Sequence, residues 1–208
     1  MKLTEDSKIL IIGLGLIGGS YAAKLSQAGY HVSAITRSQS GIDYALENNI
    51  ISNGTTEIDK DLIASADLII FALPPIAFLD WVDNYGQLIQ AHTLVTDVTG
   101  VKSSIIGEVQ AALPQGAEFI AAHPMAGREV GGVQNADPEL FKKANYIVHP
   151  TEKNSQEAID TCIQLGETLG FAHIAVLSPQ EHDEMIAYLS QLTHVIAVTL
   201  MKANDNPK

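Results

Sequence analysis

Cysteine, arginine and charged residues are scarce in this sequence. Its 208 residues include one cysteine, Cys162, and 17% are charged, with a net charge of −12. A single cysteine excludes an internal disulfide and is typical of a reducing compartment. The negative charge argues against binding to nucleic acid or to an anionic membrane, because either partner requires a basic surface. Since Arg37 and Arg128 are the only arginines, an anionic ligand would depend on local donors.

Long apolar runs and an N-terminal signal pattern are also lacking. The chain begins with the polar segment MKLTEDSK, and its apolar runs are shorter than the roughly 20 residues that span a bilayer. These features predict a cytoplasmic protein without a membrane segment. The hydrophobic content of 46% suffices for one sizeable core with an appendage.

The strongest signal is the stretch ILIIGLGLIGGS, residues 9–20, where an apolar run ends in three glycines and a helical pattern follows. The first glycine allows a sharp turn, the second lets the backbone approach a pyrophosphate, and the third lets helix and strand pack closely. The helix N-terminus presents unpaired N–H groups to phosphate. The stretch predicts a dinucleotide site with these cofactor contacts: Gly13, Gly15, Leu16, Ile17 and Gly18.

Thr36, Arg37 and Ser38 follow the second predicted strand, residues 31–35. Roughly 20 residues beyond the glycines, NAD-binding proteins place a carboxylate on the ribose hydroxyls, and none is present here. A guanidinium between two hydroxyls suits a 2′-phosphate, because it pairs with phosphate bidentately. The sequence therefore favours NADP as the cofactor. The alternative is NAD, with Arg37 merely solvated.

Short apolar runs alternate with amphipathic stretches as far as residue 177, a rhythm typical of a parallel sheet covered by helices. Strands are predicted at residues 67–73, 93–98 and 118–122, and helices at 57–65 and 76–89. The predicted fold class is α/β: a Rossmann-like, doubly wound, mainly parallel sheet in a dinucleotide-binding domain of residues 1–177. A separate long helix occupies residues 178–208.

Polar or rigid residues follow several of the predicted strands at the sheet edge where ligands of such folds bind. Leu73 and Pro74 would form a rim for the cofactor ring, although a proline also simply ends a strand. Thr99 and Lys102 are candidates to touch substrate or nicotinamide; a helix cap by Thr99 is the competing interpretation. His123, at the end of its strand, is well placed for proton transfer.

The long helix begins with a capping box, Ser178-Pro179-Gln180-Glu181, and no breaker follows until about residue 203. In a regular helix Asp183, Ser190 and His194 lie on one stripe. We expect this stripe to line a cleft, with a solvated face as the alternative. A metal site from the histidines is not expected, because His182 and His194 are twelve residues apart on one helix. A Ser–His–Asp hydrolase is equally disfavoured, since no nucleophile elbow is present.

Residues 123–141, HPMAGREVGGVQNADPELF, resemble the HPMAGxExxG…LF signature of prephenate and arogenate dehydrogenases, the TyrA-type enzymes of tyrosine biosynthesis. Other elements occur in the family's order: the glycine turn, a strand ending in proline, a D-x-x-x-x-K segment and an E-H-D stretch before a second histidine. The segment SQLTH, residues 190–194, is similar to the family's S-x-L-P-H motif.

The resemblance implies NAD(P)-dependent oxidative decarboxylation of a small cyclohexadienyl substrate, prephenate or arogenate, with no metal. His123 would accept the hydroxyl proton as hydride passes to the nicotinamide and CO2 leaves. Ser190 and His194 would act in catalysis and contact the polar groups of the substrate. Lys102 would lie at the substrate and set the Thr99 loop, and Arg128 would supply positive potential for a carboxylate.

Three departures from the family's pattern keep other functions open. Gly100 stands where a serine is common, so a hydroxyl beside the catalytic histidine is absent unless Thr99 replaces it, and Thr193 stands in place of proline. The chain ends at Lys208, where family members continue into a helical dimerisation domain; its long helix should expose an apolar face and form a homodimer. The alternatives are a catalytically silent NADP-binding sensor or interaction module, and another hydroxyacid-type dehydrogenase.

Overall fold

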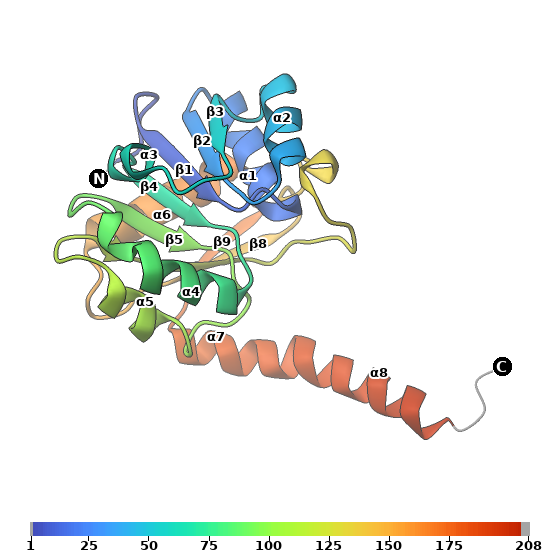
Figure 1. Cartoon of the computed structure of the whole chain (residues 1–208). Helices are drawn as coiled ribbons and strands as arrows, with labels where there is room; N and C mark the ends of the chain where they lie inside the picture. The colour runs from blue at the N-terminus through green and yellow to red at the C-terminus, as the bar shows by residue number, and fades with distance from the viewer. Residues whose placement is uncertain (1, 205–208) are drawn as a thin grey trace.

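The computed structural model describes residues 2–204. Its main sheet contains β1 (Lys8–Ile12), β2 (His31–Ile35), β3 (Asn53–Thr55), β4 (Leu68–Phe71), β5 (Leu94–Asp97) and β6 (Glu118–Phe119). The strands are all parallel, in the order β3-β2-β1-β4-β5-β6 (Figure 1). This is the strand order of doubly wound dinucleotide-binding sheets. The predicted fold class is confirmed.

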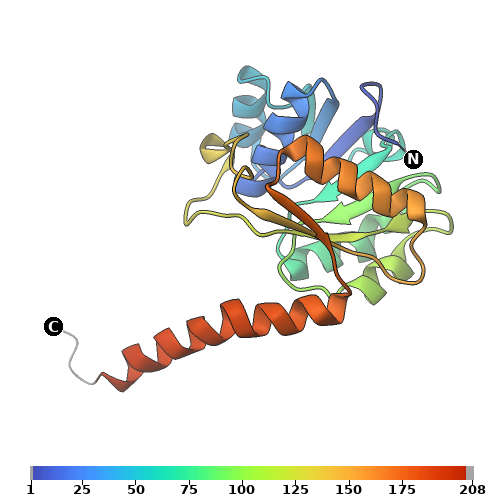
Figure 2. The ribbon, with the colours of Figure 1, turned by 180° about the vertical axis from the view of Figure 1, so that it is seen from behind.

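Helices cover both faces of this sheet. They are α1 (Leu16–Gln27), α2 (Gln39–Glu47), α3 (Lys60–Ala64), α4 (Pro75–Tyr85), α5 (Ile106–Ala112) and α6 (Gln156–Leu169). Alternate residues of β1 point to opposite faces, so Ile9 and Ile11 pack with α1, α2 and α6, while Leu10 and Ile12 pack with α3, α4 and α5. Figure 2, the view from behind, shows α6 in front of the main sheet. Burial on both faces explains why these strands read as continuous apolar runs.

A second, three-stranded sheet differs from the prediction of one strand over residues 118–122. It contains β7 (Ala121–Pro124), β8 (Asn145–His149) and β9 (His173–Val176), with β7 antiparallel to β8 and β8 parallel to β9. The chain leaves the main sheet after Phe119. The Ala122 N–H donates to Asp97 Oδ1 (3.1 Å) and its carbonyl accepts from Lys102 Nζ (2.6 Å). These side chains take the hydrogen bonds that would have extended the β5–β6 ladder.

Two helices are shorter than predicted. Asp59 caps α3 by accepting from Leu62 N (2.9 Å), so the helix begins at Lys60 rather than Glu57. The segment predicted as a helix over 76–89 consists of α4 and a 3-10 turn, Gly86–Leu88.

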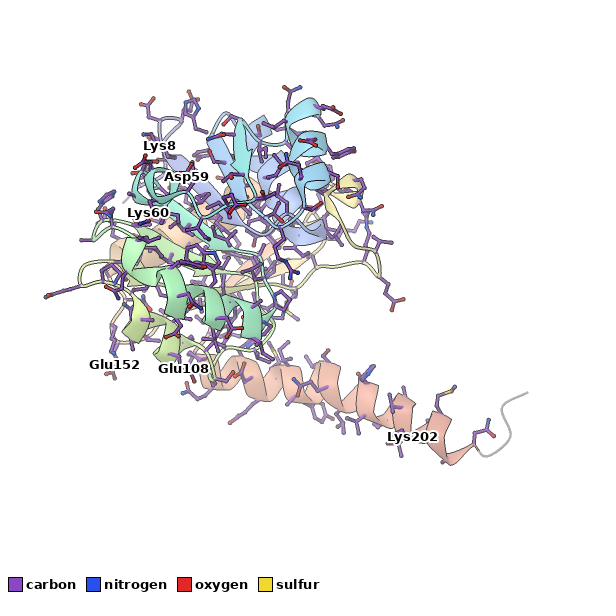
Figure 3. The ribbon with its side chains drawn as sticks, in the orientation of Figure 1. Lys8, Asp59, Lys60, Glu108, Glu152 and Lys202 are labelled. Atoms are coloured by element: carbon purple, nitrogen blue, oxygen red, sulfur yellow. The ribbon has the colours of Figure 1, made fainter. Side chains whose placement is uncertain are left out.

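The C-terminal helix begins with the predicted capping box: Ser178 Oγ accepts from Glu181 N (3.2 Å), and the Glu181 carboxylate accepts from Ser178 N (3.0 Å). The helix is not regular, however. It consists of α7 (Pro179–Ile186), a π-helical turn (Ala187–Gln191) and α8 (Leu192–Ala203). It projects from the domain in both views (Figures 1 and 2), with side chains extending into solvent and Lys202 near its far end (Figure 3).

The helix from Pro179 to Ala203 is long and apolar enough, by length and composition, to cross a membrane: its mean hydropathy is 1.2 over an 18-residue window that is 6% buried. The prediction that no such segment exists considered only unbroken apolar runs, and in this helix polar residues interrupt the apolar ones. An apolar helix surface that packs against other helices has the same length and composition.

Candidate functional site

The glycine turn lies at the switch point of the sheet, where β1 and β4 are neighbours and their connections leave in opposite directions. Gly13 has φ +103°, and a Cβ at Gly18 would collide with the Gly13 carbonyl. A Cβ at Gly15 would meet nothing within 4 Å, and Gly15 provides no side-chain cap for α1. The first N–H groups of α1 therefore receive no side-chain cap from Gly15. The turn fits a pyrophosphate, which needs close backbone approach and free donors.

The other predicted cofactor contacts surround this turn. Leu73 lies beside Gly13, since its Cδ2 would be 2.9 Å from a Cβ there, and Pro74 is the N-cap of α4. The Gly13 N–H donates to the Ile35 carbonyl (2.8 Å), so the segment that follows β2 starts next to the glycines. In this segment Arg37 is exposed.

Ser38 is the N-cap of α2, and its hydroxyl accepts from Gly41 N (3.1 Å). Thr36 precedes Arg37 and is partly buried. Arg37 forms no salt bridge among residues 2–204. Its guanidinium is therefore available to a ligand at the N-terminus of α2, beside the pyrophosphate site.

His123 is held by a chain of hydrogen bonds that reaches the C-terminal helix. Its Nδ1 lies 2.8 Å from His182 Nε2, and His182 Nδ1 lies 2.9 Å from Asp183 Oδ1. Asp183 also accepts from the backbone N–H groups of Lys102 (3.1 Å) and Ser103 (2.8 Å). The start of α7 is thus joined both to the loop after β5 and to the histidine at the end of β7.

Burial keeps two histidines of this cluster neutral. Burial, with the nearby positive charge of Lys102, lowers the pKa of His123 to about 4. His149 is fully buried, its ring centroid lies 4.3 Å from that of His182, and the same causes lower its pKa to about 3. Its Nδ1 donates to the Leu177 carbonyl (3.2 Å). His123 is therefore an imidazole, able to accept a proton, at neutral pH.

Lys102 lies inside the protein rather than at the open edge of the sheet. Its fully buried Nζ contacts the Asp97 carboxylate at 2.7 and 2.9 Å, Thr99 Oγ1 at 3.3 Å and the Ala122 carbonyl at 2.6 Å. Burial lowers the pKa of Lys102, and Asp97 opposes that shift. Of the two predicted roles of Lys102, this placement favours holding the Thr99 loop over contact with a substrate.

Position 100 lies directly beside His123. A Cβ at Gly100 would be 3.6 Å from His123 Nε2, an ordinary van der Waals contact. The Thr99 hydroxyl does not replace the missing serine, because it is hydrogen-bonded to the Asp97 carboxylate and to the Val101 carbonyl (3.0 Å). Thr99 is buried and stabilises the loop, while His123 Nε2 faces the glycine.

Arg128 belongs to the loop after β7. Its guanidinium pairs with Asp137 Oδ2 (2.6 Å), and its side chain is 52% exposed. The same loop is tied to α1, because the Asp137 N–H donates to Ser20 Oγ (3.0 Å). Arg128 therefore belongs to a loop that is tied to α1, and its role toward a substrate carboxylate stays a prediction.

Ser190 and His194 are not brought to His123 by this structure. Both are exposed, and neither forms a hydrogen bond with His123 within the described part of the chain. With Gln191, Thr193 and Val195 of the same helix, they line an open hollow of about 520 Å³. The predicted stripe assumed a regular helix, but the π turn changes the rotation between Asp183 and Ser190. Their catalytic role stays a prediction.

Sequence reasoning missed three members of the site: Asp97, His149 and His182. The spacing from Asp97 to Lys102 was noted only as part of the resemblance, and the pair they form requires the loop geometry. His182 belongs to the E-H-D stretch of the resemblance, but the only role that the sequence suggests for it is that of a metal ligand. Within residues 2–204, no group of three or more His, Cys, Asp or Glu side chains is arranged to hold a metal ion.

Comparisons with known proteins agree with this geometry. Residues 21–176 match the family model "Prephenate dehydrogenase, nucleotide-binding domain". The chain is 31% identical over 206 residues to prephenate dehydrogenase of Bacillus subtilis, covering 97% of this chain and 54% of that protein. It is 32% identical over 202 residues to cyclohexadienyl dehydrogenase of Zymomonas mobilis, covering 96% and 68%. It thus spans about half of the Bacillus protein, with 54% covered.

Solved structures superpose closely on the chain. Arogenate dehydrogenase of Synechocystis gives a TM-score of 0.86 at 29% identity, covering 97% of this chain and 70% of that one. Prephenate dehydrogenase of Aquifex aeolicus, in complex with hydroxyphenyl propionate and NAD+, gives 0.87 at 26% identity, covering 98% and 70%. With its dinucleotide turn and buried histidine cluster, the chain belongs to the prephenate dehydrogenase family.

Proposed function

We propose that this chain carries the catalytic histidine and the cofactor site of an enzyme that oxidatively decarboxylates prephenate or arogenate, in tyrosine biosynthesis. The observation that carries the proposal is the position of His123. Its neutral ring lies beside Gly100, in the loop that follows β5, and this loop lies at the same sheet edge as the glycine turn. The names of the relatives, prephenate, arogenate and cyclohexadienyl dehydrogenase, support the substrate class.

In the proposed reaction, His123 Nε2 accepts the proton of the substrate hydroxyl as that carbon is oxidised. A bound pyridine nucleotide supplies the hydride acceptor. The ring then loses CO2 and becomes aromatic. Lys102 and Asp97 hold the Thr99 loop against His123, and Arg128 attracts a substrate carboxylate. Ser190 and His194 contact the substrate from the helix.

Spectroscopic measurement of cofactor reduction tests the proposal. The chain is mixed with NADP+ or NAD+ and with prephenate or arogenate, and cofactor binding is measured separately by calorimetry. We expect reduced cofactor with at least one of the two substrates. Binding of NADP without reduction by either substrate would contradict the proposal and favour a cofactor-binding sensor.

For the cofactor we propose a preference for NADP, supported by exposed Arg37 at the N-terminus of α2 and by the lack of a carboxylate after β2. Arg37→Ala is expected to weaken NADP+ binding by about 10- to 100-fold, since a hydrogen bond to a charged group contributes about 1.5–3 kcal/mol. Calorimetric titration with NADP+ and NAD+ checks this. NAD+ affinity is the internal control and stays unchanged; an equal loss for both cofactors contradicts the preference.

For the assembly we propose a homodimer formed through the C-terminal helix, with residues 178–208 starting a second, helical domain. Residues 205–208 lie outside the described part of the chain. The support is a set of exposed apolar side chains on the helix: Tyr188, Leu189, Leu192, Val195, Ile196, Val198, Leu200 and Met201. We also propose that the protein is cytoplasmic and that its apolar helix is covered by protein rather than by lipid.

Sedimentation equilibrium of the chain tests this assembly. The unmodified chain should be a dimer at micromolar concentration, and Ile196→Glu should give a monomer, because the charge would be buried at the interface. Lys202→Glu, near the far end of the helix, is the control and should remain dimeric (Figure 3). A monomeric unmodified chain would contradict the proposal.

A further inference from the structure

We infer that Asp183 and His182 are positioning residues that hold His123 in the tautomer whose Nε2 is free to accept a proton. This inference rests on the proposed function for the role of His123 as the base. The two residues lie on α7, whereas His123 ends β7, so the chain of hydrogen bonds joins elements that are 59 residues apart in sequence.

Asp183 determines which partner donates in each hydrogen bond between Asp183, His182 and His123. Its oxygens accept from the backbone N–H groups of Lys102 and Ser103 at 3.1 and 2.8 Å. Backbone N–H groups only donate, so Asp183 must be an acceptor here. Burial opposes its ionisation, but the hydrogen bonds from Ser103, His182 and Lys102 outweigh burial and lower the pKa of Asp183. Asp183 is therefore a carboxylate with no proton to offer to His182.

The donor and acceptor roles of the two ring nitrogens of His182 follow from this carboxylate. His182 is fully buried. Because Nδ1 of His182 faces a carboxylate at 2.9 Å, we place the ring proton of His182 on Nδ1, which leaves its Nε2 as an acceptor. His123 Nδ1, 2.8 Å from that Nε2, must then donate. Neutral His123 has one ring proton, so its Nε2 is left bare and faces Gly100.

The charges around His123 give this arrangement a second effect. The positive charge of Lys102 disfavours a proton on His123, whereas Asp97 and Asp183 favour it. Asp97 is already paired with Lys102. Asp183 is thus the carboxylate that compensates the positive charge when His123 has accepted the hydroxyl proton, acting through the shared ring of His182.

The test is the tautomer of His123 itself, read by NMR of the whole chain with ¹⁵N-labelled histidine and assigned with His123→Asn. In the unmodified chain we expect the proton on Nδ1 of His123. In Asp183→Asn, Ser103 N–H still needs the oxygen, so the amide NH2 turns toward His182 Nδ1 and donates to it. His182 must then carry its proton on Nε2 and donate to His123, which moves the His123 proton to Nε2.

The same variants are then assayed for turnover. Asp183→Asn is expected to lower kcat by about 10²-fold, because the base is in the wrong tautomer, with cofactor KM unchanged. Asp183→Glu keeps the carboxylate and should retain the native tautomer. Asp59→Asn is the matched control: this aspartate also caps a backbone N–H, at the far side of the domain from α7 (Figure 3).

A proton on Nε2 of His123 in the unmodified chain overturns the inference, and this measurement requires no variant to fold. An unchanged His123 tautomer in folded Asp183→Asn also overturns it. Because the NMR measurement needs no substrate, loss of the proposed function would leave its result intact. A native tautomer with no turnover on either substrate would reject the function and keep the positioning of His123.

Discussion

Replacing His123 with asparagine is expected to lower turnover by about 10²-fold or more while leaving NADP affinity nearly intact. General-base catalysis contributes about 10²–10⁴-fold, and asparagine has no nitrogen that accepts the hydroxyl proton. The asparagine amide would still donate toward His182, so the surrounding structure should be retained. Steady-state kinetics with NADP+ and the better substrate, beside calorimetry of cofactor binding, measure both quantities.

His31→Asn is the matched control, since His31 is an exposed histidine at the opposite end of the sheet, at the start of β2. Its turnover should be that of the unmodified chain. The acid limb of the pH profile supplies a second check. Because the base must be unprotonated, turnover should fall only as the pH approaches about 4, the lowered pKa of His123. Unchanged turnover in His123→Asn would remove the histidine from the mechanism.

Lys102→Met is expected to reduce the free energy of unfolding by about 3–5 kcal/mol, the cost of leaving a buried charge without its partner. Methionine fills the space of the lysine stem but cannot pair with Asp97, which is fully buried. The Ala122 carbonyl loses its 2.6 Å donor as well. Urea unfolding followed by circular dichroism measures the change.

Lys24→Met is the control for this substitution. Lys24 pairs with Glu139 at 3.0 Å, but the two side chains are 25% and 47% exposed. An exposed ion pair contributes about 0–1 kcal/mol, so the loss should be small. Equal losses of unfolding free energy in the two variants would show that the buried Lys102–Asp97 pair contributes no more to stability than the exposed Lys24–Glu139 pair.

The glycine turn and the α/β architecture were predictable because both depend on neighbours in sequence. Gly13 and Gly18 serve a turn of a few residues, and β1 is apolar at every buried position because helices cover both faces of its sheet. The capping box at Ser178 is equally local. Helix ends were less predictable. A single hydrogen bond to the Asp59 side chain places the start of α3 at Lys60 instead of the predicted Glu57.

The sequence by itself determined the dinucleotide turn, the class of a doubly wound, mainly parallel sheet and the family. Only the tertiary structure decided how residues 118–124 divide between two sheets, and that His182, rather than Ser190 or His194, lies against His123. The physical reason is distance along the chain. The Asp183 contacts with Lys102 and Ser103 join residues 81 and 80 positions apart, and no local pattern of apolar and polar residues encodes such a pairing.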